Sequence, residues 1–316
     1  MPSQRDILRT MCRSAYDLQE LRIQMGLRLC ANFRSKLSEL GAEEQTDEEG
    51  ELSEKAKKLI DLLKGSYTRL TDGVARNRKL PEREGFQGDE LISDYTELVL
   101  VAQYMAVEGN ERSQFSQLES VLQEIPIYTQ YLKGVRGIGP AMATVLISYF
   151  DPYKARHISA FWAYAGLDVA ADGRGRSKRT EHLVDRVYTK KDGTSAERKS
   201  VTYEPWLKAR LMGVLAGSFL RSSSPWRAAY DGRRHRILSD PAREKVTLAE
   251  YKKRHKAGEN TNQLWPPLRI HKDALRYMMK QFLRDFWVEW RTLEGLPVTE
   301  PYSVDKLGQR PHGEAA

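Results

Sequence analysis

The sequence predicts a mainly α-helical protein, in which a helical-bundle scaffold precedes a helix-hairpin-helix domain with a small β-hairpin insertion. Three observations predict this class. Apolar residues recur every three or four positions over long segments of the first 125 residues and again near residue 280, which is typical of helices with one buried face. Segment 135–143 has a glycine on each side of one apolar residue, which permits a tight turn between helices. Two strand-like segments flank a Lys-Asp-Gly-Thr turn near residue 193.

The N-terminal scaffold is expected to span residues 1–88. Its first helix should cover residues 4–40, because apolar side chains recur there at helical spacing. The acidic segment 41–51 is predicted to be a loop, and Ser53 is the candidate N-cap of a second helix over residues 53–70. The imperfect heptad of the first helix favours an intramolecular bundle. A homo-oligomer formed through these N-terminal helices is the alternative.

A helical segment over residues 89–133 should connect the scaffold to the C-terminal domain. The pair Gly109-Asn110 is expected to break it in two, since both residue types are poor helix formers. Its last part, residues 126–133, should be the first helix of the helix-hairpin-helix motif. We expect the basic domain to cover residues 134–293 and a tail to cover residues 294–316.

The motif is the most specific local pattern of the chain. Gly137 and Gly139 flank one apolar residue, and Pro140 stands where a helix over residues 141–148 begins, a position at which the missing N–H costs nothing. Such a turn directs backbone N–H groups at a helix N-terminus outward, where they can bind a phosphate oxygen. The candidate phosphate-binding residues are Arg136, Gly137, Ile138, Gly139 and Ala141. The alternative is that the glycines only join two packed helices.

The net charge of +8 is unevenly distributed along the chain. Residues 171–256 contain 22 Lys and Arg against 10 Asp and Glu, a net charge of +12, so the remainder carries −4. A positive field concentrated in one segment favours a polyanionic partner. Of two possible polyanionic partners, we expect a nucleic acid and not an anionic membrane. The basic residues are interleaved with turns and aromatic residues and do not form one amphipathic helix.

The segments after the motif carry a resemblance to a known family. GIGP at residues 137–140 is followed by a helix of small residues, by AYAGL at 163–167, which Gly166 should end, and by a glycine-rich basic loop at 172–179. This succession resembles the C-terminal domain of the insertion-sequence one-ten family of transposases, most strongly over residues 132–167. The resemblance implies DNA as the partner, RNA as a guide, and activity in transposition or recombination.

The chain departs from that family in two places. Full-length members pair this domain with an N-terminal nuclease-like domain that carries acidic catalytic residues, whereas the N-terminal region here has helical patterns. The family's C-terminal serine stands in a Ser-Gly pair after AYAGL, where this chain has Asp172-Gly173. Ser177 is the candidate nucleophile, because a hydroxyl in this basic loop lies in a strong positive field. The alternative for Ser177 is an ordinary loop serine.

Further basic residues are candidates for nucleic-acid contact. They lie in the loop, at the tip of the hairpin predicted over residues 181–204 and on a helix predicted over residues 269–293, and they are Arg174, Arg176, Lys178, Arg179, Lys190, Lys191, Arg276 and Lys280. A β-ribbon can lie in a groove of nucleic acid, and a solvated basic loop is the alternative.

The predicted C-terminal helix has a basic stripe that starts at Lys272 and ends at Arg284. This stripe faces either the same nucleic acid as the motif or solvent, in which case it pairs with Asp273 and Asp285. Before this helix, Ser224, which a proline follows, is expected to be the N-cap of another helix.

Several classes of site are not predicted. The sequence has no zinc-binding spacing, no dinucleotide fingerprint and no Walker phosphate loop. We therefore expect no cofactor, and a divalent metal only where a nuclease domain or partner is present. Cys12 and Cys30 should be buried and reduced, since about 27 Å would separate them along one helix. The absence of an apolar span or signal-peptide core predicts no membrane partner and a cytoplasmic, nucleoid-associated location.

The expected function is therefore DNA binding of the mobile-element transposase type. Catalytic competence stays open, because neither the serine pair nor the acidic domain is found. One alternative is a non-catalytic DNA- or RNA-binding or bridging module, and another is a structural helical protein whose basic face meets an acidic protein.

Overall fold

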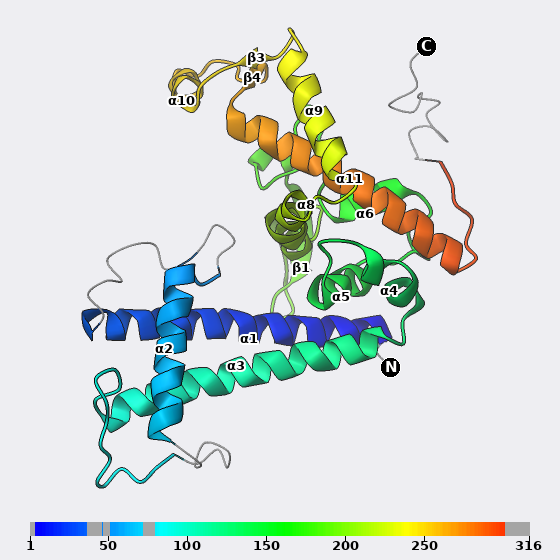
Figure 1. Cartoon of the computed structure of the whole chain (residues 1–316). Helices are drawn as coiled ribbons and strands as arrows, with labels where there is room; N and C mark the ends of the chain where they lie inside the picture. Colours follow the sequence, from blue (N-terminus) through cyan, green and yellow to red (C-terminus); the bar gives the residue numbers. More distant parts are fainter. Residues whose placement is uncertain (1–3, 37–45, 47–50, 72–79, 301–316) are drawn as a thin grey trace. The chain divides into compact units, whose positions relative to one another are not determined.

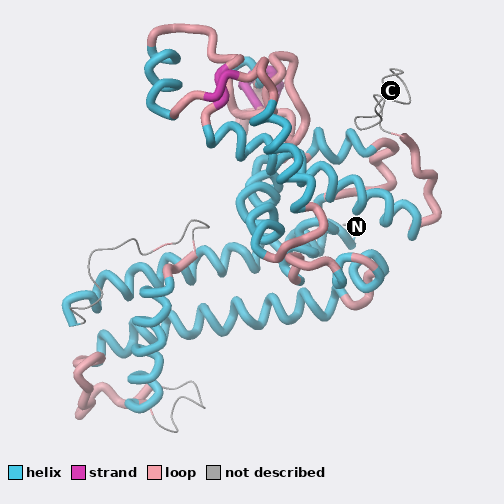
Figure 2. The backbone as a smooth tube through the Cα atoms, turned by 45° about the horizontal axis from the view of Figure 1, so that its top comes forward, coloured by secondary structure: helices cyan, strands magenta, loops and turns pink. Residues whose placement is uncertain are grey.

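The computed structural model describes residues 4–36, 46, 51–71 and 80–300 and is mainly helical (Figures 1 and 2). Its strands are an antiparallel hairpin of β1 (Val184–Thr189) and β2 (Ser195–Ser200) and a two-residue parallel pair, β3 (Glu244–Lys245) with β4 (Leu264–Trp265). The predicted fold class is confirmed. The chain divides into two compact units, Met1–Val121 and Leu122–Ala316. Within the described residues, no helix has the length and apolar character needed to span a bilayer.

The first unit is built from α1 (Gln4–Phe33), α2 (Glu54–Leu70) and nearly all of α3 (Tyr95–Leu122), and Figure 1 shows α2 running across the other two helices. A 3₁₀ turn, η1 (Arg34–Lys36), follows α1, and the predicted continuation of that helix to residue 40 lies outside the described residues. The hydroxyl of Ser53 accepts a hydrogen bond from the Ala56 N–H, which confirms Ser53 as the N-cap of α2.

The core of the first unit lies where the three helices meet. It includes Phe33 from α1, Leu63 from α2 and Leu98 from α3, all fully buried. Cys12 and Cys30 are buried and free, as predicted.

The predicted break at Gly109-Asn110 is wrong, because α3 continues through both residues. Both are exposed, and a Cβ atom added at Gly109 would meet no atom within 4 Å. On the next turn, Glu111 accepts a 2.5 Å hydrogen bond from the Arg22 guanidinium of α1. Glycine costs an exposed helix about 1 kcal/mol, and the packing on both sides of it outweighs this cost.

The central helix of the second unit is α11 (Pro267–Leu293), which packs against α9 (Arg227–Ser239), α6 (Ile158–Tyr164) and α4 (Pro126–Gln130) (Figure 1). Its large apolar residues form the core, as the sequence predicts, with Phe282 and Phe286 fully buried. The indole N–H of Trp287 donates a 2.9 Å hydrogen bond to the Ala155 carbonyl. This bond ties α11 to the loop before α6.

A nearly continuous helix runs from residue 205 to residue 221. It consists of α7 (Pro205–Ala209), a π-helical segment η5 (Arg210–Leu215) and α8 (Ala216–Arg221). Leu207, Leu211, Leu215 and Phe219 recur every four residues and are buried. π-Helical turns are rare and are frequent at functional sites, so the position of η5 beside the basic loop is relevant to the site.

The predicted N-cap at Ser224 is wrong. Helix α9 begins at Arg227, and its N-cap is Trp226. Ser224 instead belongs to a turn, in which its carbonyl accepts a hydrogen bond from the Arg227 N–H, after Ser223 at a φ of +50°. Trp226 stacks on Phe219 and meets Phe282 edge-on, both at 5.0 Å, so packing of this ring delays the start of the helix.

Residues 244–265 contain structure that the sequence did not predict. They form α10 (Leu248–Lys256) between β3 and β4. The side chain of Thr247 accepts a hydrogen bond from the Glu250 N–H and caps α10.

Candidate nucleic-acid interface

The helix-hairpin-helix turn joins α4 and a 3₁₀ turn, η3 (Leu132–Gly134), to α5 (Pro140–Tyr149). The Ile138 N–H donates a 3.1 Å hydrogen bond to the Val135 carbonyl, and Gly137 has a φ of +92°, which only glycine adopts without strain. Gly139 is the N-cap of α5, and no side chain caps this end. Helical N–H groups in the first turn have no partner within their own helix, so the turn presents an uncapped helix N-terminus.

The turn is held against α8. The Ser218 hydroxyl donates a 2.8 Å hydrogen bond to the Gly137 carbonyl. A Cβ atom at Gly137 would lie 2.8 Å from Ser222 Oγ and 3.1 Å from a ring carbon of Phe219. Gly137 therefore has a packing role, as in the alternative that the glycines join two helices. Gly139 differs, because a Cβ atom there would meet no atom within 4 Å.

The residues predicted to grip phosphate are accessible to different degrees. Arg136 and Gly139 are exposed, whereas Gly137, Ile138 and Ala141 are half-buried. Lys133 is also exposed, and its ammonium group donates to the side chain of Gln123. The outer surface of the turn thus combines two cationic side chains with the N-terminus of α5.

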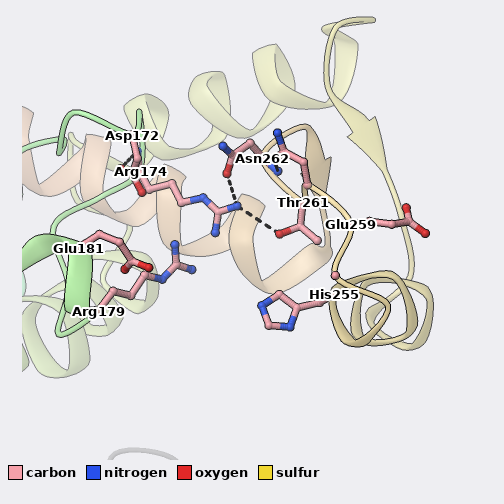
Figure 3. A pocket seen from close by; sticks show the side chains of 10 residues that line it. Asp172, Arg174, Arg179, Glu181, His255, Glu259, Thr261 and Asn262 are labelled. Carbon is pink, nitrogen blue, oxygen red and sulfur yellow. Dashed lines mark hydrogen bonds between the residues drawn. The ribbon is translucent and has the colours of Figure 1, made fainter.

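The basic loop after α6 is a tight turn. Gly173 has a φ of +74°, and the Ala170 N–H donates a 2.8 Å hydrogen bond to the Arg174 carbonyl. The Arg174 guanidinium donates to the side chains of Thr261 and Asn262 in the loop before β4 (Figure 3). The guanidinium of Arg176 pairs with Asp168 at 2.7 Å. Lys178 and Arg179 are exposed.

The stripe on α11 is partly turned inward and partly paired. Arg276 forms a 3.3 Å ion pair with Asp273, and Arg284 forms one of 3.0 Å with Asp285. The Lys280 ammonium lies 4.1 Å from the centre of the Trp162 ring. Burial, followed by the charge of Arg276, lowers the pKa of Lys280.

The hairpin is confirmed and is a solvent-exposed ribbon. Every residue of β1 is exposed, and Val187 pairs with Glu197 in an antiparallel register. Lys190 and Lys191 lie exposed at the turn, which closes through a 2.8 Å hydrogen bond from the Lys190 N–H to the Thr194 carbonyl. Most of these side chains are exposed, so a partner can contact the ribbon on both faces.

Ser177 lies beside a buried histidine and an aspartate. Its hydroxyl is 3.0 Å from His182 Nδ1, and its backbone N–H donates to the same atom at 3.1 Å. His182 Nε2 lies 3.2 Å from Asp172 Oδ2, within ion-pair distance, but without the alignment of a hydrogen bond. Nδ1 thus accepts hydrogen bonds across the loop, and the carboxylate approaches the other ring nitrogen. This geometry closes the loop, and it also places a base next to the hydroxyl.

A cavity of about 720 Å³ lies between the basic loop, the π-helical segment and the start of α11. Its lining includes a single carboxylate, that of Asp273, and seven cationic side chains: Arg174, Arg176, Arg179, Lys208, Arg269, Lys272 and Arg276. Arg174 and Arg179 also line a second cavity, of about 450 Å³, together with Asp172, Glu181 and Glu259 (Figure 3). The structure therefore gathers Arg174, Arg176, Arg179 and Arg276 at one place.

Lys208 is the most perturbed cation of this cavity. Its ammonium group donates to the Arg176 carbonyl and lies 4.5 Å from the centre of the Tyr203 ring. Burial, followed by the charge of Arg276, lowers the pKa of Lys208 to about 8. An anion placed beside this ammonium would raise its pKa again.

Sequence reasoning missed Lys208, Tyr251 and Arg269, all of which line the cavity. Their segments are far apart in the chain, and no motif marks them. The pKa of Tyr251 is lowered, first by a hydrogen bond with Thr261 and also by the charge of Arg174. Arg269 donates to three carbonyls of the loop before α11, those of Thr261, Asn262 and Leu264. The only sequence signal for Lys208 and Tyr251 was the basic composition of residues 171–256, and Arg269 lies outside that segment.

Comparisons with protein-family models, with curated proteins and with solved structures found no significant match. Among the residues that the structure describes, no group of three or more His, Cys, Asp or Glu side chains is arranged to hold a metal ion. The geometry and charge of the second unit are therefore the features that bear on function.

Proposed function

We propose that the second unit binds nucleic acid through its backbone and that the protein is a transposase-like DNA-binding component of a mobile element. The observation that carries the proposal is the uncapped N-terminus of α5, flanked by the exposed cations Lys133 and Arg136. A phosphate oxygen would satisfy the N–H groups there and meet the positive end of the helix dipole.

The charge of the second unit supports a polyanionic partner. Residues 171–256 carry a net charge of +12, and the exposed loop cations Lys178 and Arg179 extend the basic surface. Lys190 and Lys191 add two charges at the end of a ribbon that is exposed on both faces. A ribbon of this kind fits a groove or follows a strand. DNA is the proposed partner, and RNA is the alternative.

Strand cleavage is a separate proposal, for which Ser177 is the candidate nucleophile. His182 Nδ1 is close enough to act as its base, but the same atom also accepts from the Ser177 backbone N–H. This second bond favours a loop-closing role and therefore a non-catalytic binding or bridging function. Nicking of a supercoiled plasmid in the presence of divalent metal, compared between the native chain and Ser177→Ala, tests the catalytic version. Loss of nicking in the variant alone would support catalysis, and equal results would support binding only.

Binding itself is tested by fluorescence anisotropy with a labelled duplex at salt concentrations from about 50 to 200 mM, over which phosphate contacts weaken strongly. The double variant Lys133→Ala/Arg136→Ala should lower the affinity and reduce the salt slope by about two, one for each lost phosphate contact.

The matched control removes two exposed cations from the first unit, Arg28→Ala/Lys58→Ala, and should keep the native slope. Binding that is absent, or that does not respond to salt, would contradict the proposed function. A structured RNA that binds more tightly than the duplex would favour the RNA alternative.

A further inference from the structure

The lining of the 720 Å³ cavity combines a cationic and an apolar set of side chains. The cationic set comes from the basic loop, Lys208 and the first turns of α11. The apolar and aromatic set comes from η5, α10, β4 and the start of α11. The two sets meet at Trp265, over whose ring the Arg269 guanidinium lies at 4.1 Å, and both belong to the second unit.

The cationic set carries more positive charge than the neighbouring carboxylates neutralise. Arg176 and Arg276 are paired with Asp168 and Asp273. Among the ion pairs of the described residues, none involves Arg174, Arg179, Lys208 or Lys272. The Nε atom of Arg174 is buried and makes no hydrogen bond within that part of the chain. Arg174 and Lys208 are half-buried, and half-buried cations without a counter-ion are costly, whereas Arg179 and Lys272 are exposed and add positive charge at the rim. The cationic set is therefore suited to an anion.

The apolar set exposes groups that proteins usually bury. Leu248 is 48% exposed and Leu268 is 53% exposed, and both lie at the cavity. Met212 from the π-helical segment and Tyr251 from α10 also belong to this set. His271, whose pKa is lowered by burial and then by Arg234 and Lys272, adds a polar group that can face the edge of a heterocycle. His271 Nδ1 already lies 2.8 Å from the Tyr230 hydroxyl, so the preference of this set for a flat ring over an alkyl chain rests on stacking against the aromatic side chain of Tyr251.

We propose that this cavity binds one nucleotide, with its phosphate at the cations that have no carboxylate partner, Arg174, Arg179, Lys208 and Lys272, and its base between Leu248, Leu268 and Tyr251. Cavities of roughly 300–1,000 Å³ hold ligands of this size. The nucleotide is either the phosphorylated end of a strand or a free nucleoside monophosphate, because both present the same phosphate and base. This proposal is independent of phosphate binding at the helix-hairpin-helix turn, because no residue of that turn lines the cavity.

The test is isothermal titration of the full chain with adenosine 5′-monophosphate, adenosine and inorganic phosphate. The monophosphate should bind at least about tenfold more tightly than adenosine or inorganic phosphate, since its phosphate and its base both make contacts in the cavity. Arg179→Ala/Lys272→Ala should weaken monophosphate binding about tenfold and leave adenosine binding unchanged. Leu268→Asp should weaken the binding of both adenosine and the monophosphate. Both cations and Leu268 are exposed, so these variants should fold.

The controls carry the same changes away from the cavity. Arg28→Ala/Lys58→Ala removes two exposed cations of the first unit, and Leu238→Asp changes a leucine of α9 that is 45% exposed. Neither should alter monophosphate binding. Lys133→Ala/Arg136→Ala should also leave monophosphate binding unchanged. The experiment therefore distinguishes a loss of duplex binding at the turn from a loss of nucleotide binding in the cavity.

A trinucleotide with and without a 5′-phosphate separates the two sources. Displacement of the monophosphate by the phosphorylated trinucleotide alone assigns the cavity to a strand end, whereas displacement by neither trinucleotide assigns it to a free nucleotide. The proposal is overturned if none of the ligands binds, if phosphate binds as tightly as the monophosphate, or if both cavity variants bind like the native chain.

Discussion

Gly175 lies directly against the guanidinium group of Arg276, so closely that an added Cβ atom would stand 2.1 Å from Arg276 Cζ. The contact joins the basic loop to α11 and keeps Arg276 next to Asp273, with which it forms a 3.3 Å ion pair. A side chain at position 175 would therefore force the Arg276 guanidinium to move.

Gly175→Ala should therefore destabilise the second unit. The methyl group must displace the end of the Arg276 side chain, which can move, so the cost should be at the lower end of the range for overpacking, about 1 kcal/mol. Chemical denaturation measures the loss. The combination with Arg276→Ala should recover part of it, because the clash is then absent and Asp273 keeps its 2.8 Å ion pair with Arg233. If the two changes were additive in a double-mutant cycle, residues 175 and 276 would have no interaction energy.

Gly109→Ala should change the free energy of unfolding in the opposite direction. Gly109 lies within α3, and a Cβ atom there would meet no atom within 4 Å. Alanine reduces the freedom of the unfolded chain and should raise the free energy of unfolding by about 0.5–1 kcal/mol. Urea denaturation compared with the native chain checks this value, and a destabilised variant would show that α3 is not continuous at this residue.

The contrast between these glycines shows what the sequence can predict. The helical period marked α11 and its buried face, and the Gly-Ile-Gly pattern marked the turn before α5, because both are local. The same local rule failed at Gly109, where packing of the neighbouring turns decides the outcome. Nothing in the spacing of Gly173 and Gly175 shows that only the second contacts Arg276.

The cavity lies beyond sequence reasoning for a similar reason. Its cations come from the loop at 174–179, from Lys208 and from α11, and only the folded chain brings these segments together. Arg276 and Lys280 were predicted as members of a surface stripe, and the period of α11 is consistent with that position. Their partners, Gly175 and Trp162, come from outside the helix, which the period cannot predict.

Lys208 should make stability depend on pH. Its pKa is lowered from 10.5 to about 8 by burial and by Arg276, so the folded chain binds fewer protons than the unfolded chain between about pH 8 and 10.5. The free energy of unfolding should rise with pH across this window, and the cost of the buried charge should be fully present below it.

Lys208→Met should remove this contribution, while the exposed control Lys58→Met should keep it. Urea denaturation of the three proteins from pH 7 to 10.5 gives the comparison, because the other titrating groups are shared. An identical pH slope in the native chain and Lys208→Met would show that Lys208 titrates in its ordinary range.

Gly139→Asp separates the stability of the turn from its proposed grip on phosphate. Gly139 is the exposed N-cap of α5, its φ of −95° suits any residue, and space is open at its Cβ position. Aspartate is among the best N-cap residues and should stabilise α5 by a few tenths of a kcal/mol relative to glycine. Its carboxylate would occupy the N–H groups and repel a phosphate, so duplex affinity should fall about tenfold or more.

Gly139→Ser is the matched control, because serine caps equally well without a charge. Thermal denaturation should therefore rank both variants at or above the native chain, while anisotropy titration should rank Gly139→Asp well below Gly139→Ser. If both variants bound the duplex like the native chain, the N-terminus of α5 would not be in contact with phosphate, and the turn would act only as the junction between α4 and α5.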